Sequence, residues 1–328
     1  MGNLKALITG VTGQSGSYLS EILLKKGYTV HGITRRISKP NNENIRDIFE
    51  DPNFHIHLAD MSDGSSIRRI INEVQPDEIY NLAGMSYVRA SYDCPSVTMD
   101  INTNGFLRIL EAVRDLKLDC KIYQACSSEM FGKVQEIPQK ETTPFYPRSP
   151  YGVSKAAAYY LARTYRESYG MKIYCGVLFN HESPRRGEEF LSRKVCKAVA
   201  EIVSGKRDKL VLGNLEAKRD WGYAKEYMEW VYNIVQHDTP DDFVIATGET
   251  HSVKEFVQKA FEAVNIFHWE KYVDYDKSLT RPAEVDLLIG DASKSASVLG
   301  FTPKVRFNDL VKLMVDAELE KHGVKVSI

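Results

Sequence analysis

Two short groups of residues in the middle of the chain carry side chains that can exchange protons. Ser127 and Glu129 are two positions apart at the end of an apolar run, so in an extended backbone they point the same way. Tyr151 and Lys155 are four positions apart in an alanine-rich segment, which places them on one face of a helix. An ammonium beside a phenol lowers the pKa of the phenol. Tyr151 is therefore a candidate base, with Ser127 bonded to the same substrate hydroxyl.

Each of these assignments has an alternative that the spacing alone leaves open. Tyr-x-x-x-Lys is frequent by chance, and two surface residues on a helix would give the same pattern. The alternative for Glu129 is a solvent-exposed carboxylate on a loop, without a role in proton transfer. The proton-transfer interpretation therefore depends on the fold that the rest of the chain predicts.

A glycine-rich segment near the N-terminus predicts a nucleotide site. A short apolar run ends at Thr9, then Gly10, Gly13 and Gly16 follow, and an amphipathic run begins directly afterwards. In this strand–turn–helix context the first glycine allows a sharp turn and the second lets the backbone approach a diphosphate. The third lets the helix pack on the strand. Because the first amide groups of the helix would face the phosphates, we predict dinucleotide binding rather than a turn without a ligand.

The residues after the second predicted strand, 29–34, indicate which dinucleotide binds. A site for NAD usually has Asp or Glu there, bonded to the ribose 2′-hydroxyl. This chain has Arg35 and Arg36 instead. Two guanidinium groups suit a 2′-phosphate, which a carboxylate would repel, so we predict NADP as the cofactor.

The order of the predicted elements indicates an α/β fold. Strands are expected at 5–9, 29–34, 54–60, 78–83 and 121–125, and helices at 17–26, 66–74 and 97–114. This alternation predicts a Rossmann-type doubly wound parallel sheet with right-handed crossovers. Asp60 and Met61 end the third strand, at the edge of the sheet where ligands bind in such folds.

The regular alternation fades after residue 180. Helices are expected at 190–204, 225–235 and 308–321, with short strands at 210–212 and 243–246. We therefore predict an NADP-binding domain over residues 1–180, which carries the catalytic residues. Residues 181–328 are predicted to form a smaller mixed α/β C-terminal lobe for the substrate, with some segments returning to the first domain.

Composition excludes several classes of protein. The net charge of -1 gives no basic surface for nucleic acid. The five cysteines show no Cys-x-x-Cys pair, and the histidines show no His-Glu-x-x-His, so we predict neither a disulfide framework nor a metal. No apolar run approaches the roughly 20 residues of a membrane span, and the chain enters a strand at once, so we expect a cytoplasmic protein without a membrane partner.

Several motifs together resemble one family of enzymes. The glycine motif, Asn-Leu-Ala at 81–83, the Ser127 region and the Tyr151/Lys155 pair are similar to extended short-chain dehydrogenase/reductases that act on nucleotide sugars. Leu-Phe-Asn-His-Glu-Ser-Pro-Arg-Arg-Gly at 178–187 and Lys-Arg-Asp-Trp-Gly at 218–222 resemble the GDP-mannose 4,6-dehydratase family. The resemblance extends over nearly the whole chain, so the sequence is identified as a member of that family.

The resemblance implies a dehydration of GDP-mannose with no net redox change. Tyr151 takes the proton of the sugar 4-hydroxyl as hydride leaves C4 for NADP, Glu129 removes the C5 proton, water leaves C6, and the hydride returns there. The alternatives are a 4,6-dehydratase of another GDP-sugar such as a GDP-manno-heptose, an epimerase or reductase of the same fold, and a non-catalytic NADP-binding regulator. Epimerases and reductases need no base at C5, so Glu129 separates them from a dehydratase.

The resemblance also implies the remaining binding residues and a homodimer or homotetramer. The family usually has Asp where Ser15 stands and often Thr where Ser127 stands, and one of Arg185 and Arg186 is expected only to hold its loop. The cofactor-binding residues are Gly10, Gly13, Gln14, Gly16, Arg35, Arg36, Asp60, Met61, Leu82, Ala83, Tyr151 and Lys155. The substrate-binding residues are Ser86, Asn180, Lys194, Arg219, Arg281 and Glu284.

Overall fold

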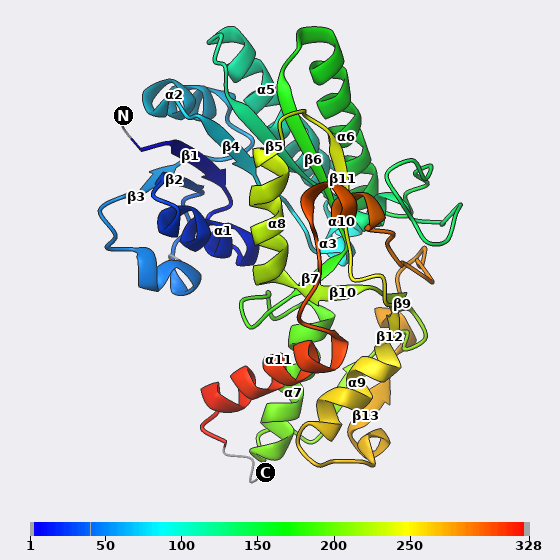
Figure 1. Ribbon diagram of the computed structural model, residues 1–328. Helices are drawn as coiled ribbons and strands as arrows, with labels where there is room; N and C mark the ends of the chain where they lie inside the picture. Colours follow the sequence, from blue (N-terminus) through cyan, green and yellow to red (C-terminus); the bar gives the residue numbers. More distant parts are fainter. Residues whose placement is uncertain (1–2, 40, 325–328) are drawn as a thin grey trace.

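One parallel sheet of seven strands forms the centre of the molecule (Figure 1). The structure is a computed structural model that describes residues 3–39 and 41–324. The strands lie in the order β3-β2-β1-β4-β5-β6-β11, and all neighbours are parallel. They are β1 (Lys5–Thr9), β2 (Thr29–Thr34), β3 (Phe54–Leu58), β4 (Glu78–Asn81), β5 (Lys121–Ser127), β6 (Lys172–Leu178) and β11 (Asp242–Ile245). This order confirms the predicted Rossmann-type doubly wound sheet. The chain adds β2 and β3 on one side of β1 and then continues with β4 on the other side, so the order of the strands switches between β1 and β4.

Helices cover both faces of the sheet because the chain buries one apolar stripe on each helix. On one face lie α2 (Gly64–Val74), α5 (Gly105–Asp115) and α6 (Pro150–Tyr169), and their buried side chains join one apolar cluster. On the other face lie α1 (Gln14–Lys25) and α8 (Ala224–Gln236), whose buried side chains join a second cluster. Because helices cover both faces, every residue of β4 and β11 is buried, including the polar residues Glu78, Asn81 and Asp242.

The helix predicted over 97–114 is built from three consecutive segments, of which two are α-helical and one is π-helical. It consists of α4 (Pro95–Met99), a π-helical turn η2 (Asp100–Asn104) and α5, preceded by α3 (Val88–Asp93). From the π turn, Asn102 Oδ1 accepts from the backbone N–H of Met85 at 2.8 Å, and Asn102 Nδ2 donates to Ser154 Oγ at 2.9 Å. The wide turn therefore fastens the loop after β4 to helix α6.

A second body, at the bottom of Figure 1, packs around its own apolar cluster. Its helices are α7 (Leu191–Val203), α9 (Val253–Glu262) and α11 (Phe307–Lys321). Three short strand pairs complete it or join it to the sheet: β7 (Asn180–Glu182) with β10 (Trp221–Tyr223), β9 (Lys218–Arg219) with β12 (His251–Ser252), and β8 (Leu210–Leu212) with β13 (Val273–Tyr275). The ring of Phe307 stacks on Trp221 at 5.8 Å between centroids and on His251 at 3.8 Å.

Three segments from the second half of the chain pack on the central sheet. Strand β11 pairs with β6 at the edge of the sheet, α8 covers one face, and α10 (Ser293–Leu299) packs beside β11. The remaining short helices are η1 (Glu43–Ile48), η3 (Ser128–Met130), η4 (Trp269–Tyr272) and η5 (Lys277–Leu279). The boundary between 1–180 and 181–328 stays a prediction. Within the described ranges, the helices fall short of the length and apolarity that crossing a membrane requires.

Candidate active site

A cavity of ≈ 1240 Å³ lies at the carboxyl ends of the strands and continues into the second body. Single-ligand pockets usually measure about 300–1,000 Å³, so this volume suits a cofactor and a substrate together. Every residue that the sequence predicted for the site lines the cavity, with the exception of Arg36. The lining comes from the turn between β1 and α1, the ends of β2, β4 and β5, helix α6, and the segments 178–194, 212–221 and 279–284.

The geometry of the first turn supports the predicted roles of Gly10 and Gly16, and that of Gly13 toward a diphosphate stays a prediction. Gly10 has φ +70, a conformation that favours glycine, and a Cβ there would lie 2.9 Å from the Cα of Ala83. A Cβ at Gly16 would lie 2.4 Å from the carbonyl oxygen of Gly10, so α1 can pack closely only with glycine there. Gly13 is the N-cap of α1 and has no side-chain cap, so the first amide groups of the helix are open to an anionic group.

A buried polar chain aligns the ends of β1, β4 and β5 below the cavity. Thr9 Oγ1 donates to Asn81 Oδ1 at 2.8 Å and accepts from the N–H groups of Leu82 and Ala83, each at 3.0 Å. Asn81 Nδ2 then donates to Gln124 Oε1 at 2.7 Å. The sequence analysis did not identify Thr9 and Gln124, which are fully buried and align the strand ends below the site. A polar residue among the apolar residues of a predicted strand is the signal that could have identified them, because a buried polar group needs a hydrogen-bond partner.

Gln14 fastens the glycine turn to β7. Its Nε2 donates to the carbonyl of His181 at 3.0 Å, and its Oε1 accepts from Ser183 Oγ at 2.7 Å. His181 in turn lies 3.2 Å from Ser15 Oγ through Nε2 and 2.9 Å from the Phe179 carbonyl through Nδ1. Burial lowers the pKa of His181 to about 4, so Nδ1 donates to the carbonyl and Nε2 accepts from Ser15 at neutral pH.

Tyr151 and Lys155 lie on the first turns of α6, which Ser149 caps by accepting from the N–H of Gly152 at 3.0 Å. The Lys155 ammonium donates to the carbonyl of Ala125 at 2.9 Å and is 5.9 Å from the centroid of the Tyr151 ring. Burial raises the pKa of Tyr151 to about 12, while a hydrogen bond from Ser127 acts in the opposite direction. The prediction that the pKa of Tyr151 is lowered is therefore wrong, because burial outweighs the groups that act against it, and the Lys155 ammonium binds the backbone of β5.

Glu129 is buried in the cavity rather than solvated on a loop. It lies in η3 directly after β5, and its N–H donates to Ser127 Oγ at 3.3 Å. The two side chains reach the cavity because the chain turns into a helix there, and the extended backbone assumed from the sequence is wrong. Glu129 is 7% exposed, and its Oε1 lies 3.1 Å from Arg281 Nη1.

Several cations surround the part of the cavity in the second body. Arg219 is 6% exposed, and its Nη1 donates to the carbonyls of Lys218 and Val285 at 2.9 and 2.7 Å. Among the residues that the structure describes, Arg219 has no carboxylate within ion-pair distance, and burial lowers the pKa of its guanidinium. A buried cation with carbonyl partners alone suits an anionic ligand. Lys194, whose Nζ donates to the Val211 carbonyl at 2.8 Å, also lines this part.

The arginines of the pairs 35/36 and 185/186 differ in their contacts, although Arg35, Arg185 and Arg186 all line the cavity. Arg35 lines the cavity and Arg36 does not, although both are exposed. The cavity lining therefore supports the prediction that Arg35 binds the cofactor, while for Arg36 it stays a prediction. Arg185 binds Glu21 Oε1 of α1 at 2.5 Å, so it holds the loop. Arg186 lies 3.3 Å from Glu182 Oε2 and lines the cavity.

The other predicted residues lie along the same cavity. Asn180 is the first residue of β7, and Glu284 Oε1 accepts from the backbone N–H of Arg281 at 2.8 Å. Asp60, Met61 and Ser86 line the cavity after β3 and β4. Within the described part of the chain, His, Cys, Asp and Glu form no group of three or more arranged to hold a metal ion.

Comparison with known proteins relates the chain to one enzyme family. The family model described as GDP-mannose 4,6 dehydratase matches residues 7–314. GDP-mannose 4,6 dehydratase 1 of Arabidopsis thaliana is 50% identical over 325 residues, which cover 96% of this chain and 90% of that protein. GDP-mannose 4,6 dehydratase of Homo sapiens is 48% identical over 339 residues, which cover 96% and 91%.

Solved structures with lower identity share the fold. DesIV, a dTDP-glucose 4,6-dehydratase from Streptomyces venezuelae with NAD and TYD bound, superposes with a TM-score of 0.87 at 22% identity and covers 98% of both chains. RMD from Pseudomonas aeruginosa complexed with NADPH superposes with a TM-score of 0.79 at 20% identity and covers 97% of this chain and 100% of that one.

Proposed function

Because this chain belongs to the GDP-mannose 4,6-dehydratase family, we propose that it converts GDP-mannose into GDP-4-keto-6-deoxymannose with loss of water, as an NADP-dependent lyase. The observation that carries the proposal is the position of Glu129, which is buried in the cavity that Tyr151 and Lys155 also line. An epimerase or a ketosugar reductase needs a residue that acts at C4, but it needs no carboxylate to remove a proton at C5.

The chemistry of the groups that line the cavity supports NADP as the cofactor. The open amide groups at the start of α1 suit its diphosphate, and Arg35 at the end of β2 suits a 2′-phosphate. Asp60, Met61, Leu82 and Ala83 line the same region. NADP held by these residues would supply the acceptor for the hydride from C4 of the sugar and the donor for its return to C6.

Tyr151 removes the proton of the sugar 4-hydroxyl. Two groups act against the burial that raises its pKa: the hydrogen bond from Ser127, and the positive charge of Arg186. Lys155 binds the Ala125 carbonyl, so it joins α6 to β5 and fixes the depth of Tyr151 in the cavity. Ser127 therefore has a direct part in stabilising the phenolate, while Lys155 acts on its position.

Glu129 removes the proton at C5 once the 4-ketone has made that proton acidic. The carboxylate is held in place by Arg281 at 3.1 Å, and the N–H of Arg281 is held by Glu284 at 2.8 Å. The Glu129 carboxyl then gives this proton to the C6 hydroxyl, which leaves as water, and C5 regains a proton from solvent when hydride adds at C6.

The nucleotide diphosphate binds among the cations of the second body. Arg219, Arg281 and Lys194 line this part of the cavity together with Asn180. Each charge-assisted hydrogen bond to a phosphate contributes about 1.5–3 kcal/mol. The buried position of Arg219 without a carboxylate partner supports an anionic ligand there. Ser86, which also lines the cavity, is our candidate contact for the hexose.

The proposal is tested by incubating the protein with GDP-mannose and NADP and measuring the mass of the product. We expect a product lighter by one water. A product of unchanged mass would indicate an epimerase, and turnover of a GDP-manno-heptose in preference to GDP-mannose would reassign the substrate.

We also propose a homodimer or homotetramer. Helix α6 keeps Val153, Tyr160 and Tyr169 between 44% and 54% exposed, and Val97 of the adjacent α4 is 51% exposed. Such apolar side chains on neighbouring helices suit burial against a second copy. Light scattering that returned the monomer mass of 37.2 kDa at micromolar protein would exclude this assembly. A cytoplasmic location stays a prediction.

A further inference from the structure

The loop between β7 and α7, residues 183–190, brings several side chains to the cavity. Arg185, Arg186, Glu189 and Phe190 of this loop all line it. The guanidinium carbon of Arg186 lies 3.8 Å from the centre of the Phe190 ring, and its Nε lies 3.3 Å from Glu182 Oε2. Loops of this length move unless other elements hold them. The position of Arg186 therefore depends on what holds the loop.

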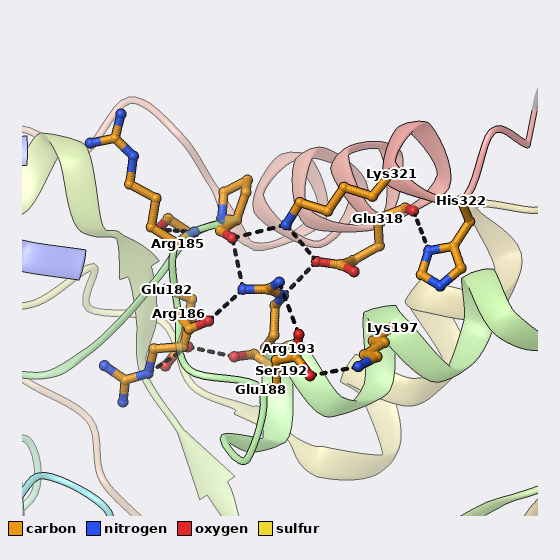
Figure 2. Close-up of polar contacts among 12 residues, drawn as sticks. Glu182, Arg185, Arg186, Glu188, Ser192, Arg193, Lys197, Glu318, Lys321 and His322 are labelled. Carbon is orange, nitrogen blue, oxygen red and sulfur yellow. Dashed lines mark hydrogen bonds and ion pairs between the residues drawn. The ribbon is translucent and has the colours of Figure 1, made fainter. Parts of the chain in front are cut away.

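Arg193, on the first turn of α7, holds the loop by its backbone. Its Nη1 donates to the carbonyls of Pro184 and Arg186, at 2.9 and 2.6 Å (Figure 2). Its Nη2 lies 3.7 Å from Glu188 Oε1, and Lys197 binds the other oxygen of that carboxylate at 2.5 Å. One guanidinium therefore touches the loop at its beginning, middle and end.

Glu318 of the C-terminal helix α11 supports Arg193 from the opposite side. Its Oε1 forms an ion pair with Arg193 Nε, which has no aligned hydrogen-bond partner. The Glu318 side chain is 2% exposed, and Lys321 Nζ lies 3.1 Å from Oε1 and 3.5 Å from the Pro184 carbonyl (Figure 2). Helix α11 lies outside the cavity, since none of its residues lines it.

A buried ion pair is weak evidence for stability, because well-packed apolar side chains of similar size often replace one without loss. The forked shape of arginine, in contrast, can hold two carbonyls and a carboxylate in one fixed geometry. Leucine and methionine could fill the space between α7 and α11, but they could not bind the carbonyls of Pro184 and Arg186. The contacts therefore fit a role in placing the loop better than a role in holding the helices together.

We propose that Arg193 and Glu318 are positioning residues, which fix the loop 183–190 so that Arg186 faces the cavity and thereby set the affinity for ligands and the turnover. The effect on turnover rests on the proposed function. The effect on the order of the loop and on cofactor binding does not, so the two can fail separately.

The test uses two variants and one control in the full chain. Arg193→Met/Glu318→Leu removes both buried charges and keeps an apolar contact between α7 and α11. Arg193→Lys keeps a cation for Glu318 but loses the forked guanidinium that binds the two carbonyls. This variant tests the positioning role if the double variant does not fold. The control is Lys312→Ala/Asp316→Ala, which removes an exposed ion pair from the same helix α11.

For each protein we would measure the melting temperature, amide hydrogen exchange in 183–190, the affinity for NADPH, and kcat and KM for GDP-mannose. We expect the double variant and Arg193→Lys to exchange faster in this loop, to bind NADPH more weakly, and to lose roughly 10- to 100-fold in kcat/KM through a raised KM as well as a lowered kcat. The control should match the unmodified protein in all four measurements.

Normal exchange in 183–190 together with unchanged NADPH affinity in both variants would overturn the proposal. A lowered melting temperature with an unchanged KM would do the same, because it would leave the pair with a purely structural role. If the unmodified protein did not dehydrate GDP-mannose, the proposed function would fail, while loop exchange and NADPH affinity would still test the positioning role.

Discussion

Replacing Ser127 with alanine should shift the pH dependence of hydride transfer to higher pH. Burial raises the pKa of Tyr151 to about 12, and the hydrogen bond from Ser127 is the largest influence that opposes it. The phenolate, which is the form that accepts the substrate proton, therefore gains population as the pH rises. Below the pKa of Tyr151 the rate of NADPH formation should increase about tenfold per pH unit.

The size of the shift follows from the loss of one hydrogen bond to a charged oxygen. Such a bond contributes about 1.5–3 kcal/mol, and about 1.4 kcal/mol corresponds to one pKa unit. Tyr151 is 8% exposed, so bulk water cannot replace the Ser127 hydroxyl fully. The Ser127→Ala profile should therefore lie about one to two pH units higher, and the rate at neutral pH should fall about 10- to 100-fold.

The assay is the rate of the first NADPH absorbance change after rapid mixing with GDP-mannose, measured across pH. Ser127→Thr is the matched variant, because it keeps the hydroxyl and should keep the position of the profile. If Ser127→Ala kept the rate of the unmodified protein below the pKa of Tyr151, or if Ser127→Thr lost as much rate as Ser127→Ala, the hydrogen bond to the phenolate would be the wrong explanation.

Three further changes test other parts of the site. Arg35→Gln should weaken NADP binding about 10- to 100-fold with little effect on NAD binding, and Arg36→Gln should weaken NADP binding less. Calorimetry measures both affinities, and equal losses for the two variants would contradict the placement of Arg35. Arg219→Met should raise the dissociation constant of GDP by about 10- to 100-fold and leave NADPH affinity unchanged, since Arg219 lies in the second body; unchanged GDP binding would remove it from the diphosphate site. Burial lowers the pKa of His181 to about 4 from 6.5, so the unfolded chain binds more protons between these values and stability should fall as the pH falls through this range, by up to about 3 kcal/mol. Urea unfolding of His181→Gln should show a smaller loss of stability between pH 7 and 4 than the unmodified protein, and an equal loss would refute the buried neutral imidazole.

Features that depend on local spacing could be predicted from the sequence. The roles of Gly10 and Gly16 follow from one turn, because the strand before it and the helix after it leave few conformations. The order of the sheet follows from the alternation of strands and helices and from the rule on crossovers. The helix over 97–114 was predicted in extent, although its π turn was not, since no residue type marks such a turn.

Features that depend on long-range contacts could not be predicted. The ammonium of Lys155 binds the carbonyl of Ala125, and this contact exists only after α6 has packed on β5. The pair between Glu129 and Arg281, and the contacts of Arg193 with Glu318, join parts of the chain that have no common periodicity. A backbone carbonyl can accept from any cation that reaches it, so the sequence carries no sign of which cation does so.

The most direct test of the account is the behaviour of Glu129→Gln with GDP-mannose in deuterated water. Gln keeps the shape of the side chain and removes the base, while Tyr151 and its hydrogen bond from Ser127 remain. We expect NADPH absorbance to appear, deuterium incorporation at C5 to fall about 10²–10⁴-fold, and the product lighter by one water to form at the same reduced rate. Incorporation of deuterium at C5 and release of that product at the rate of the unmodified protein would contradict the assignment of Glu129 as the base that makes this site a dehydratase.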